Sequence, residues 1–397
     1  MRRIAALVLL LVSLSAPAAL AAGPAATQRA LARQMRFAGP ASGALAVDLD
    51  SGTAIYAARA DVPRIPASVE KLYTTATALR TLGADGRLVT QVAAAVPRDG
   101  AGTLDGDLYL RGEGDPTFGP LDLQELAQQV ESAGVFTITG RVIGDDTAFD
   151  DRRGPPSSGY RTSAYVGPLS ALTMSHGLTG LRSPYFQPDP ARFAAKAFTS
   201  ALRARGIWVG APASTGATPP EATTMATWAS PPMVDLTRLM NLPSDNFAAE
   251  TLIKAIGAQM TGVGSTEAGA AVVREQMSQL GIHPTVVDGS GLSRADRTSP
   301  QDVVTLLQAM QGEAAFRGSM AVVGRSRTVG ARMRGTVAQD RCSAKTGTLI
   351  AVSALAGYCT TTSGTNVAFA FLMNGVNPAA AHVLQDRMTV ALAAFRP

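Results

Sequence analysis

The chain has 397 residues, a formal net charge of +5 and a charged fraction of 16%. Its Lys and Arg residues are scattered and form no basic run, so nucleic acid is not an expected partner. A chain of this length predicts about two or three domains, each with a hydrophobic core of its own.

Residues 1–21 have the pattern of a secretory signal peptide. Arg2 and Arg3 precede an apolar stretch at residues 4–12, and Ala19-Leu20-Ala21 is an A-x-A cleavage signal. The stretch is too short for a lasting membrane span, and no later stretch reaches about 18 uninterrupted apolar residues. We therefore expect a soluble protein that is exported to the periplasm or secreted, without a permanent membrane anchor.

The first predicted elements of the mature chain are a short helix at residues 28–36 and a β-hairpin. Apolar and polar residues alternate over residues 43–50 and 53–58, which predicts the two strands of the hairpin. The hairpin leads to residues 67–82, where apolar side chains recur three and four positions apart and predict a half-buried helix. Gly83 follows as the expected end of this helix.

The composition changes at residues 88–205, where glycine, proline and short alternating segments dominate. The expected strands cover residues 88–96, 102–111 and 137–143, and an expected helix covers residues 123–134. We therefore predict an inserted, β-rich domain over residues 88–205. It would divide a larger domain into residues 22–87 and 206–397.

The rest of the chain mixes helices and strands. The predicted helices cover residues 190–205, 232–241, 247–260, 265–280, 300–311 and 378–395. The predicted strands are a short one at residues 206–209 and three longer ones at residues 341–347, 352–359 and 366–373. The expected fold class is α/β (α+β), with an antiparallel sheet flanked by helices.

The chain has two cysteines, Cys342 and Cys359. Their midpoint lies between Ile350 and Ala351, where the turn of the last predicted hairpin is expected, so the two cysteines would oppose each other across its strands. An exported protein permits a disulfide, and we predict one here. The alternative is a pair of free, buried thiols.

Ser68 and Lys71 lie three residues apart at the start of a predicted helix, so both side chains project from one face. A neutral amine there could take the hydroxyl proton, which would activate the serine as a nucleophile. Taken alone, this S-x-x-K pattern is more often an ordinary N-cap serine beside a solvated lysine. The three histidines, His176, His283 and His382, show no metal-binding or catalytic spacing.

Two further motifs change that interpretation. Ser244-Asp245-Asn246 lies between two predicted helices, and Lys345-Thr346-Gly347-Thr348 lies late on a predicted strand. S-x-x-K, S-D-N and K-T-G occur together in penicillin-binding proteins and class A β-lactamases. With these motifs in this order, and with Asp288-Gly-Ser-Gly-Leu-Ser-Arg294, the chain resembles the penicillin-binding protein superfamily. It is most similar to its low-molecular-mass class C group, the D-alanyl-D-alanine carboxypeptidase/endopeptidases of the S13 peptidase family.

The resemblance implies a penicillin-binding-protein/serine β-lactamase-like fold in the larger, catalytic domain. It also implies a serine peptidase that acts on peptidoglycan stem peptides and cross-links through an acyl-enzyme. β-Lactam antibiotics would bind covalently, and no cofactor or metal is expected. The residues assigned to catalysis are Ser68, Lys71, Ser244 and Lys345, and those assigned to substrate binding are Asn246, Thr346, Gly347, Thr348, Asp146 and Arg294.

The resemblance also implies individual roles. Ser68 would be the nucleophile and Lys71 its base, with a pKa that burial near Lys345 would lower toward about 7–8. Asp146 would bind the amino group of a diaminopimelate-type side chain, and Arg294 would lie near the same pocket. Solvated loop charges are the alternative for these last two residues.

Two other functions were weighed against this one. A class A β-lactamase needs a deacylating glutamate in an E-x-x-L-N loop between S-D-N and K-T-G, and this sequence has none there. A non-catalytic wall-binding protein would not need Lys71, Ser244 and Lys345 together. The stretch between His176 and Pro190 is compressed relative to the family, so its third, outer domain is expected to be reduced or absent.

Overall fold

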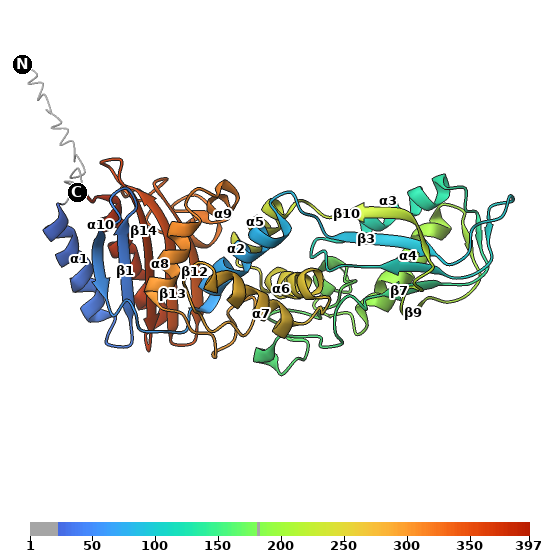
Figure 1. Ribbon diagram of the computed structural model, residues 1–397, viewed down its shortest axis with the longest axis horizontal. Coiled ribbons are helices and arrows are strands. Elements are labelled where there is room, and N and C mark those ends of the chain that lie inside the picture. The colour runs from blue at the N-terminus through green and yellow to red at the C-terminus, as the bar shows by residue number, and fades with distance from the viewer. Residues whose placement is uncertain (1–22, 181–182) are drawn as a thin grey trace, which may run out of the picture.

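The computed structural model describes residues 23–180 and 183–397, and the predicted signal peptide lies outside these ranges. The molecule is elongated (Figure 1), with a sheet covered by helices at one end, a helical middle part and a β-rich lobe at the other end. We call this last part, residues 89–229, the distal lobe. Every helix in the described part of the chain is too short or too polar to cross a membrane.

An antiparallel six-stranded sheet has the order β11-β12-β13-β14-β1-β2, which confirms the predicted antiparallel sheet. Its strands are β1 (Gly43–Asp48), β2 (Ala54–Ala58), β11 (Ala321–Val322), β12 (Cys342–Leu349), β13 (Val352–Thr360) and β14 (Asn366–Asn374). β13 and β14 are almost entirely buried because helices cover both faces of the sheet. Strands so placed are rich in small and apolar residues along their whole length.

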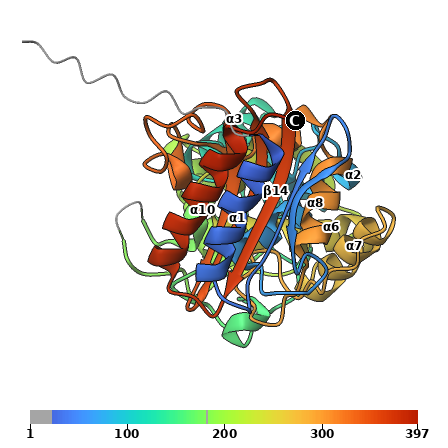
Figure 2. The ribbon, with the colours of Figure 1, turned by 90° about the vertical axis from the view of Figure 1, so that its left-hand side faces the viewer.

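Two helices from opposite ends of the chain cover one face of this sheet. They are α1 (Pro24–Phe37) and α10 (Pro378–Ala393), which lie side by side (Figure 2). The other face packs on α2 (Lys71–Leu82) and α8 (Pro300–Ala309), in a second apolar core. The predicted 67–82 helix is present, but its first turn is a 3-10 helix, η1 (Ala67–Glu70), and it ends before Gly83, which has a positive φ of +79°.

The middle of the molecule is helical. Its helices are α5 (Met233–Asn241), α6 (Asn246–Thr261), α7 (Thr266–Ser278) and the short α9 (Ala314–Gly318). α6 is buried on all sides over its first three turns because α2, α5 and α7 surround it. Its first residue, Asn246, is thereby fixed at the junction between the helical part and the sheet.

The distal lobe contains a five-stranded sheet, order β10-β3-β5-β7-β9, and a three-stranded sheet, order β4-β6-β8. Its elements are β3 (Val89–Ala94), β4 (Thr103–Leu104), β5 (Leu108–Arg111), α3 (Pro120–Ser132), β6 (Thr137–Ile138), β7 (Val142–Asp145), α4 (Pro190–Ala204), β8 (Trp208–Val209), β9 (Ser214–Thr215) and β10 (Thr223–Ala229). The strands expected at residues 102–111 and 137–143 are each split between the two sheets. The splits fall at Gly106 and Gly140, which pack so closely that a Cβ at Gly140 would lie 2.6 Å from the carbonyl oxygen of Gly106.

The distal lobe extends beyond residue 205, where the inserted domain was expected to end. β10 pairs with β3 and so belongs to the lobe, although it follows α4 in the chain. β10 was not expected from the sequence because it is an edge strand in which only Ala226 is fully buried, so its residues show no clear alternation of apolar and polar side chains.

The predicted disulfide between Cys342 and Cys359 is present. The two residues are direct partners in the β12–β13 ladder, with Cα atoms 4.0 Å apart. β12 also contains the K-T-G motif, so the disulfide links the strand that contributes to the candidate site covalently to β13.

Replacing both cysteines with serine is expected to lower the free energy of unfolding by about 3 kcal/mol, because the bridge joins residues 17 positions apart and restricts the unfolded chain. Urea unfolding of the double variant and of the wild type, both without reductant, measures this difference. Wild-type protein in dithiothreitol should show the same loss. Equal stability in all three samples would contradict the prediction.

Candidate active site

Segments that are far apart in the sequence meet at one cavity of about 890 Å³. Six of the residues singled out from the sequence line it: Ser68, Ser244, Asn246, Arg294, Thr346 and Thr348. They come from η1, the α5–α6 turn, the first residue of α6, the loop after residue 288 and β12. A segment of the distal lobe that includes Ser157, Ser163 and Tyr165 forms another part of the wall.

Lys71 is the centre of the hydrogen bonds around the first motif. Its side chain is fully buried, and its Nζ lies 3.1 Å from Ser68 Oγ, 2.8 Å from Asn246 Oδ1 and 2.7 Å from the carbonyl oxygen of Ser290. The S-x-x-K and S-D-N motifs are therefore joined directly through this amine. Among the described residues, no carboxylate forms an ion pair with Lys71.

Burial lowers the pKa of Lys71 from 10.5 to about 8. The sequence predicts that the charge of Lys345 contributes to this shift. In the structure, desolvation is the cause, and the carboxyl groups of Asp288 and Glu250 oppose it. A group with this pKa is partly neutral near pH 7 and can accept a proton there.

The second motif begins with a residue in an uncommon conformation. Ser244 has φ +64°, in the left-handed region, and Asp245 caps α6 by accepting from the backbone N–H of Ala248. The Ser244 hydroxyl accepts a hydrogen bond from Nζ of Lys345 at 2.7 Å. Lys345 is buried, and burial together with the nearby charge of Lys71 holds its pKa well below 10.5.

Close packing between β12 and η1 brings the third motif to the nucleophile. A Cβ added to Gly347 would lie 2.6 Å from the carbonyl oxygen of Pro66 and 3.0 Å from the backbone nitrogen of Ser68. Only glycine permits this approach. Thr346 and Thr348, on either side of it, line the cavity.

The two remaining predicted residues behave differently. Arg294 lines the cavity and donates one hydrogen bond to the carbonyl oxygen of Ile350, at 3.0 Å. Asp146 is not part of the cavity wall, and its carboxylate accepts from Arg153 at 2.7 Å and from the Ser170 hydroxyl at 2.8 Å.

His176, for which the sequence indicates no catalytic role, contacts the second motif in the structure without lining the cavity. Nε2 of His176 lies 3.2 Å from Oδ2 of Asp245, and its ring packs against Phe247. The distal lobe also reaches Asn246, whose side-chain amide donates to the carbonyl oxygen of Tyr165 at 3.1 Å. These contacts join residues about 70–80 positions apart, so no local motif could have indicated them.

The His176–Asp245 hydrogen bond raises the pKa of His176 above 6.5. Protonated His176 is therefore expected to stabilise the fold well below pH 6.5, and this contribution is expected to disappear as the pH rises through the raised pKa. Unfolding free energies of wild type and His176→Gln, measured across this range, should differ in acid and converge in base. His283→Gln, at an exposed position, should follow the wild type. A difference that does not change with pH would contradict the assignment.

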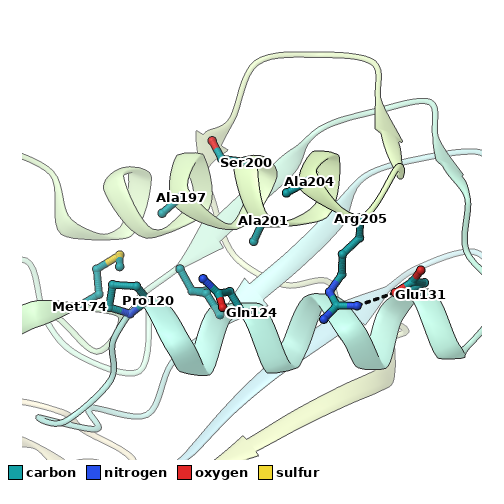
Figure 3. Close-up of a pocket in the computed structure, with 10 residues that line it drawn as sticks. Pro120, Gln124, Glu131, Met174, Ala197, Ser200, Ala201, Ala204 and Arg205 are labelled. Carbon is teal, nitrogen blue, oxygen red and sulfur yellow. Dashed lines mark hydrogen bonds and ion pairs between the residues drawn. The ribbon is translucent and has the colours of Figure 1, made fainter.

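A second hollow, of about 770 Å³, lies in the distal lobe between α3 and α4 (Figure 3). Small residues such as Ala197 and Ala201 form one wall, and the Arg205–Glu131 ion pair, 2.6 Å long, lies at one end. Among the described residues that line it, no hydroxyl or thiol is hydrogen-bonded to a side chain that could act as a base. Six of the site residues expected from the sequence line the cavity at Ser68, and none of them lines this second hollow.

Comparisons with known proteins agree on one family. Residues 25–184 and 185–395 match the model of the D-Ala-D-Ala carboxypeptidase 3 (S13) family. The chain is 31% identical to a D-alanyl-D-alanine carboxypeptidase of Actinomadura sp. (strain R39), in an alignment that covers 90% of this chain and 82% of the relative.

Solved structures show the same fold. The structure is similar to that of penicillin binding protein 4 from Haemophilus influenzae, with a TM-score of 0.78, 20% identity, and 90% of this chain and 97% of the other covered. A second structure of that protein, complexed with a β-lactam, matches with a TM-score of 0.75, 19% identity and the same coverage.

Proposed function

Because the chain belongs to the D-Ala-D-Ala carboxypeptidase 3 (S13) family, we propose that it hydrolyses peptidoglycan stem peptides and cross-links through an acyl-enzyme on Ser68. The enzyme is a D-Ala-D-Ala carboxypeptidase of the serine type. One observation carries the finer assignment: Nζ of Lys71 bridges Ser68 Oγ and Asn246 Oδ1 inside a buried site.

The contacts of Lys71 fit a neutral amine. A neutral amine has two N–H donors and one lone pair. The carbonyl oxygens of Asn246 and Ser290 take the two N–H groups, at 2.8 and 2.7 Å. The lone pair then faces the Ser68 hydroxyl at 3.1 Å and can accept its proton.

In the acylation step, Ser68 Oγ bonds to the carbonyl carbon of the penultimate D-alanine while its proton passes to Lys71. The backbone N–H groups of Ser68 and Thr348 would stabilise the oxyanion, at roughly 3–4 kcal/mol for each donor. The C–N bond then breaks, and the leaving amine takes the proton that Lys71 accepted, through the Ser244 hydroxyl, which Lys345 holds in place. Lys71 is then neutral again. Water next attacks the ester carbonyl carbon while Lys71 accepts its proton, and Lys71 returns this proton to Ser68 Oγ as the ester bond breaks.

The substrate backbone would lie along β12. The short strand β11 pairs only with Ser343 and Ala344, so residues 345–348 have no described strand on that side. An extended peptide can add there as a new strand. The Thr346 and Thr348 hydroxyls would then bind the terminal carboxylate.

Arg294 and Asp146 remain candidates for recognition of the substrate side chain. Arg294 is on the cavity wall, which supports its role. Asp146 could bind an amino group only after giving up its ion pair with Arg153.

The same reaction accounts for covalent inhibition by β-lactams, because a β-lactam ring presents a strained amide to Ser68. The β-lactam complex of a protein with this fold supports that proposal. Location in the periplasm or outside the cell is supported by the predicted signal peptide and by the disulfide, which is typical of exported proteins.

Mass spectrometry of purified muropeptides before and after incubation tests the proposal. Loss of terminal D-alanine from pentapeptides would establish carboxypeptidase action, and loss of cross-linked dimers would establish endopeptidase action. Fluorescent penicillin should label the protein with an adduct that persists for hours, whereas an efficient β-lactamase would release it in under a second. Unchanged muropeptides and no labelling would refute the proposal.

A further inference from the structure

Four carboxyl groups that take no direct part in the proposed reaction lie buried in this part of the molecule. They belong to Glu70, Glu250, Asp288 and Asp296, and all four residues are fully buried. The first three act on the charge of Lys71, and Asp296 neighbours Asp288 and Glu70. If each carried a negative charge, four charges would lie together without water. Such an arrangement is strongly unfavourable, so some of these groups must keep their protons.

The side chains of Asp288 and Asp296 neighbour each other, and the contact acts to lower the pKa of Asp288 and to raise the pKa of Asp296. Two carboxyl groups can form a hydrogen bond with each other only if one of them carries a proton. One oxygen of Asp296 accepts from the backbone N–H of Val287 at 2.7 Å, and the other has no donor among the described residues. A proton on that second oxygen makes it an O–H group, which can donate a hydrogen bond to Asp288.

The backbone contacts indicate which of the two residues holds the proton. Both Asp288 oxygens accept backbone N–H groups, from Gly291 at 2.6 Å and from Ser293 at 2.7 Å, which favours the ionised form of Asp288. Burial and the neighbouring carboxyl groups of Asp288 and Glu70 raise the pKa of Asp296 well above its usual range. Both arguments put the proton on Asp296.

The loop that Asp288 holds is the one that contacts the lysine. Gly291 packs against η1, where an added Cβ would lie 2.0 Å from the carbonyl oxygen of Ala67. The carbonyl of Ser290, one residue earlier, accepts one of the two N–H groups of Lys71. A displaced loop would therefore free the amine to rotate, and its lone pair would no longer face Ser68.

We propose that Asp288 and Asp296 share one proton and form a positioning pair that holds the Ser290 carbonyl on the amine of Lys71. The proposal rests on the proposed role of Lys71 as the base. The other titratable groups facing the pair are Lys71, Glu70 on η1 and Glu250 on α6. Oε1 of Glu250 accepts from the Ser290 backbone N–H at 2.9 Å.

Amide substitutions test the pair because they distinguish its two members. In Asp296→Asn, the amide N–H can donate to Asp288 and the amide oxygen can accept from Val287, so the variant resembles the protonated acid. Its acylation by fluorescent penicillin is expected to stay within about threefold of wild type, with the same dependence on pH. In Asp288→Asn, the amide group would face a backbone N–H group, and acylation should fall at least about tenfold.

The pH dependence separates a positioning role from a purely structural one. The negative charge of Asp288 raises the pKa of Lys71, so Asp288→Asn should move the acid limb of acylation to lower pH. Asp296→Asn should not move it, because protonated Asp296 carries no charge to lose. A shift of the acid limb in Asp296→Asn would overturn the proposal.

If Asp288→Asn does not fold, Asp296→Ala tests the same pair. It removes the shared proton and should slow acylation at least about tenfold relative to Asp296→Asn. Equal rates in the two Asp296 variants would overturn the proposal.

If the wild type is not acylated at all, the proposed function fails, and infrared spectroscopy still tests the pair. Asp296→Asn should lose the part of the protonated-carboxyl C=O absorption that Asp296 contributes in the wild type, and identical absorption in the two proteins would refute proton sharing.

Discussion

Ser68→Ala is expected to lower D-alanine release and penicillin acylation by at least about 10⁴-fold, because no other group can form the acyl-enzyme. The Ser68 hydroxyl is the one that Lys71 contacts, and it lies beside the close approach of Gly347. Neighbouring hydroxyls do not meet these conditions. Ser244 faces Lys345 instead, and its hydroxyl accepts a hydrogen bond from that lysine.

Intact-protein mass spectrometry after incubation with penicillin measures this prediction. Wild type should gain the mass of one penicillin and Ser68→Ala none. Ser157→Ala is the matched control, because Ser157 lines the same cavity from the distal lobe. It should be acylated within about threefold of the wild-type rate. A penicillin adduct on the Ser68→Ala protein would show that the nucleophile lies elsewhere.

The three motifs could be predicted from the sequence because each is a short, local arrangement with a chemical requirement. The β12–β13 hairpin and its disulfide were also accessible, since two cysteines placed symmetrically about a turn must meet across an antiparallel pair. In these cases the spacing along the chain determines the geometry.

The features that the sequence did not indicate depend on contacts between distant segments. His176 reaches Asp245 only because the distal lobe folds back over the start of α6. Asp288 belongs to a recognised motif, but its partner Asp296 became apparent only when the burial of both was known. Burial also decides the behaviour of Lys71, because a solvated lysine at the same position would stay protonated near pH 7.

The pH dependence of acylation is expected to follow the deprotonation of Lys71. Only the neutral amine can take the Ser68 proton, and the pKa of Lys71 in the folded enzyme is lowered to about 8. The second-order rate constant for penicillin should therefore be low in acid, rise about tenfold per pH unit, and level off above pH 8. A rate that is flat between about pH 5 and pH 9 would exclude Lys71 as the base.

Lys71→Arg should remove this dependence together with the activity, with a loss of at least about 10³-fold at every pH, because arginine does not release its proton. Lys71→Met keeps the length and apolar stem without the charge, and it should be equally inactive if the arginine variant does not fold. Lys196→Arg is the matched control, because Lys196 is exposed on α4, and it should keep both the rate and the pH profile. Lys71→Arg and Lys196→Arg can be compared directly because both changes preserve the positive charge. The two positions differ in burial, and only at the buried one does the lysine lie within hydrogen-bonding distance of a serine hydroxyl.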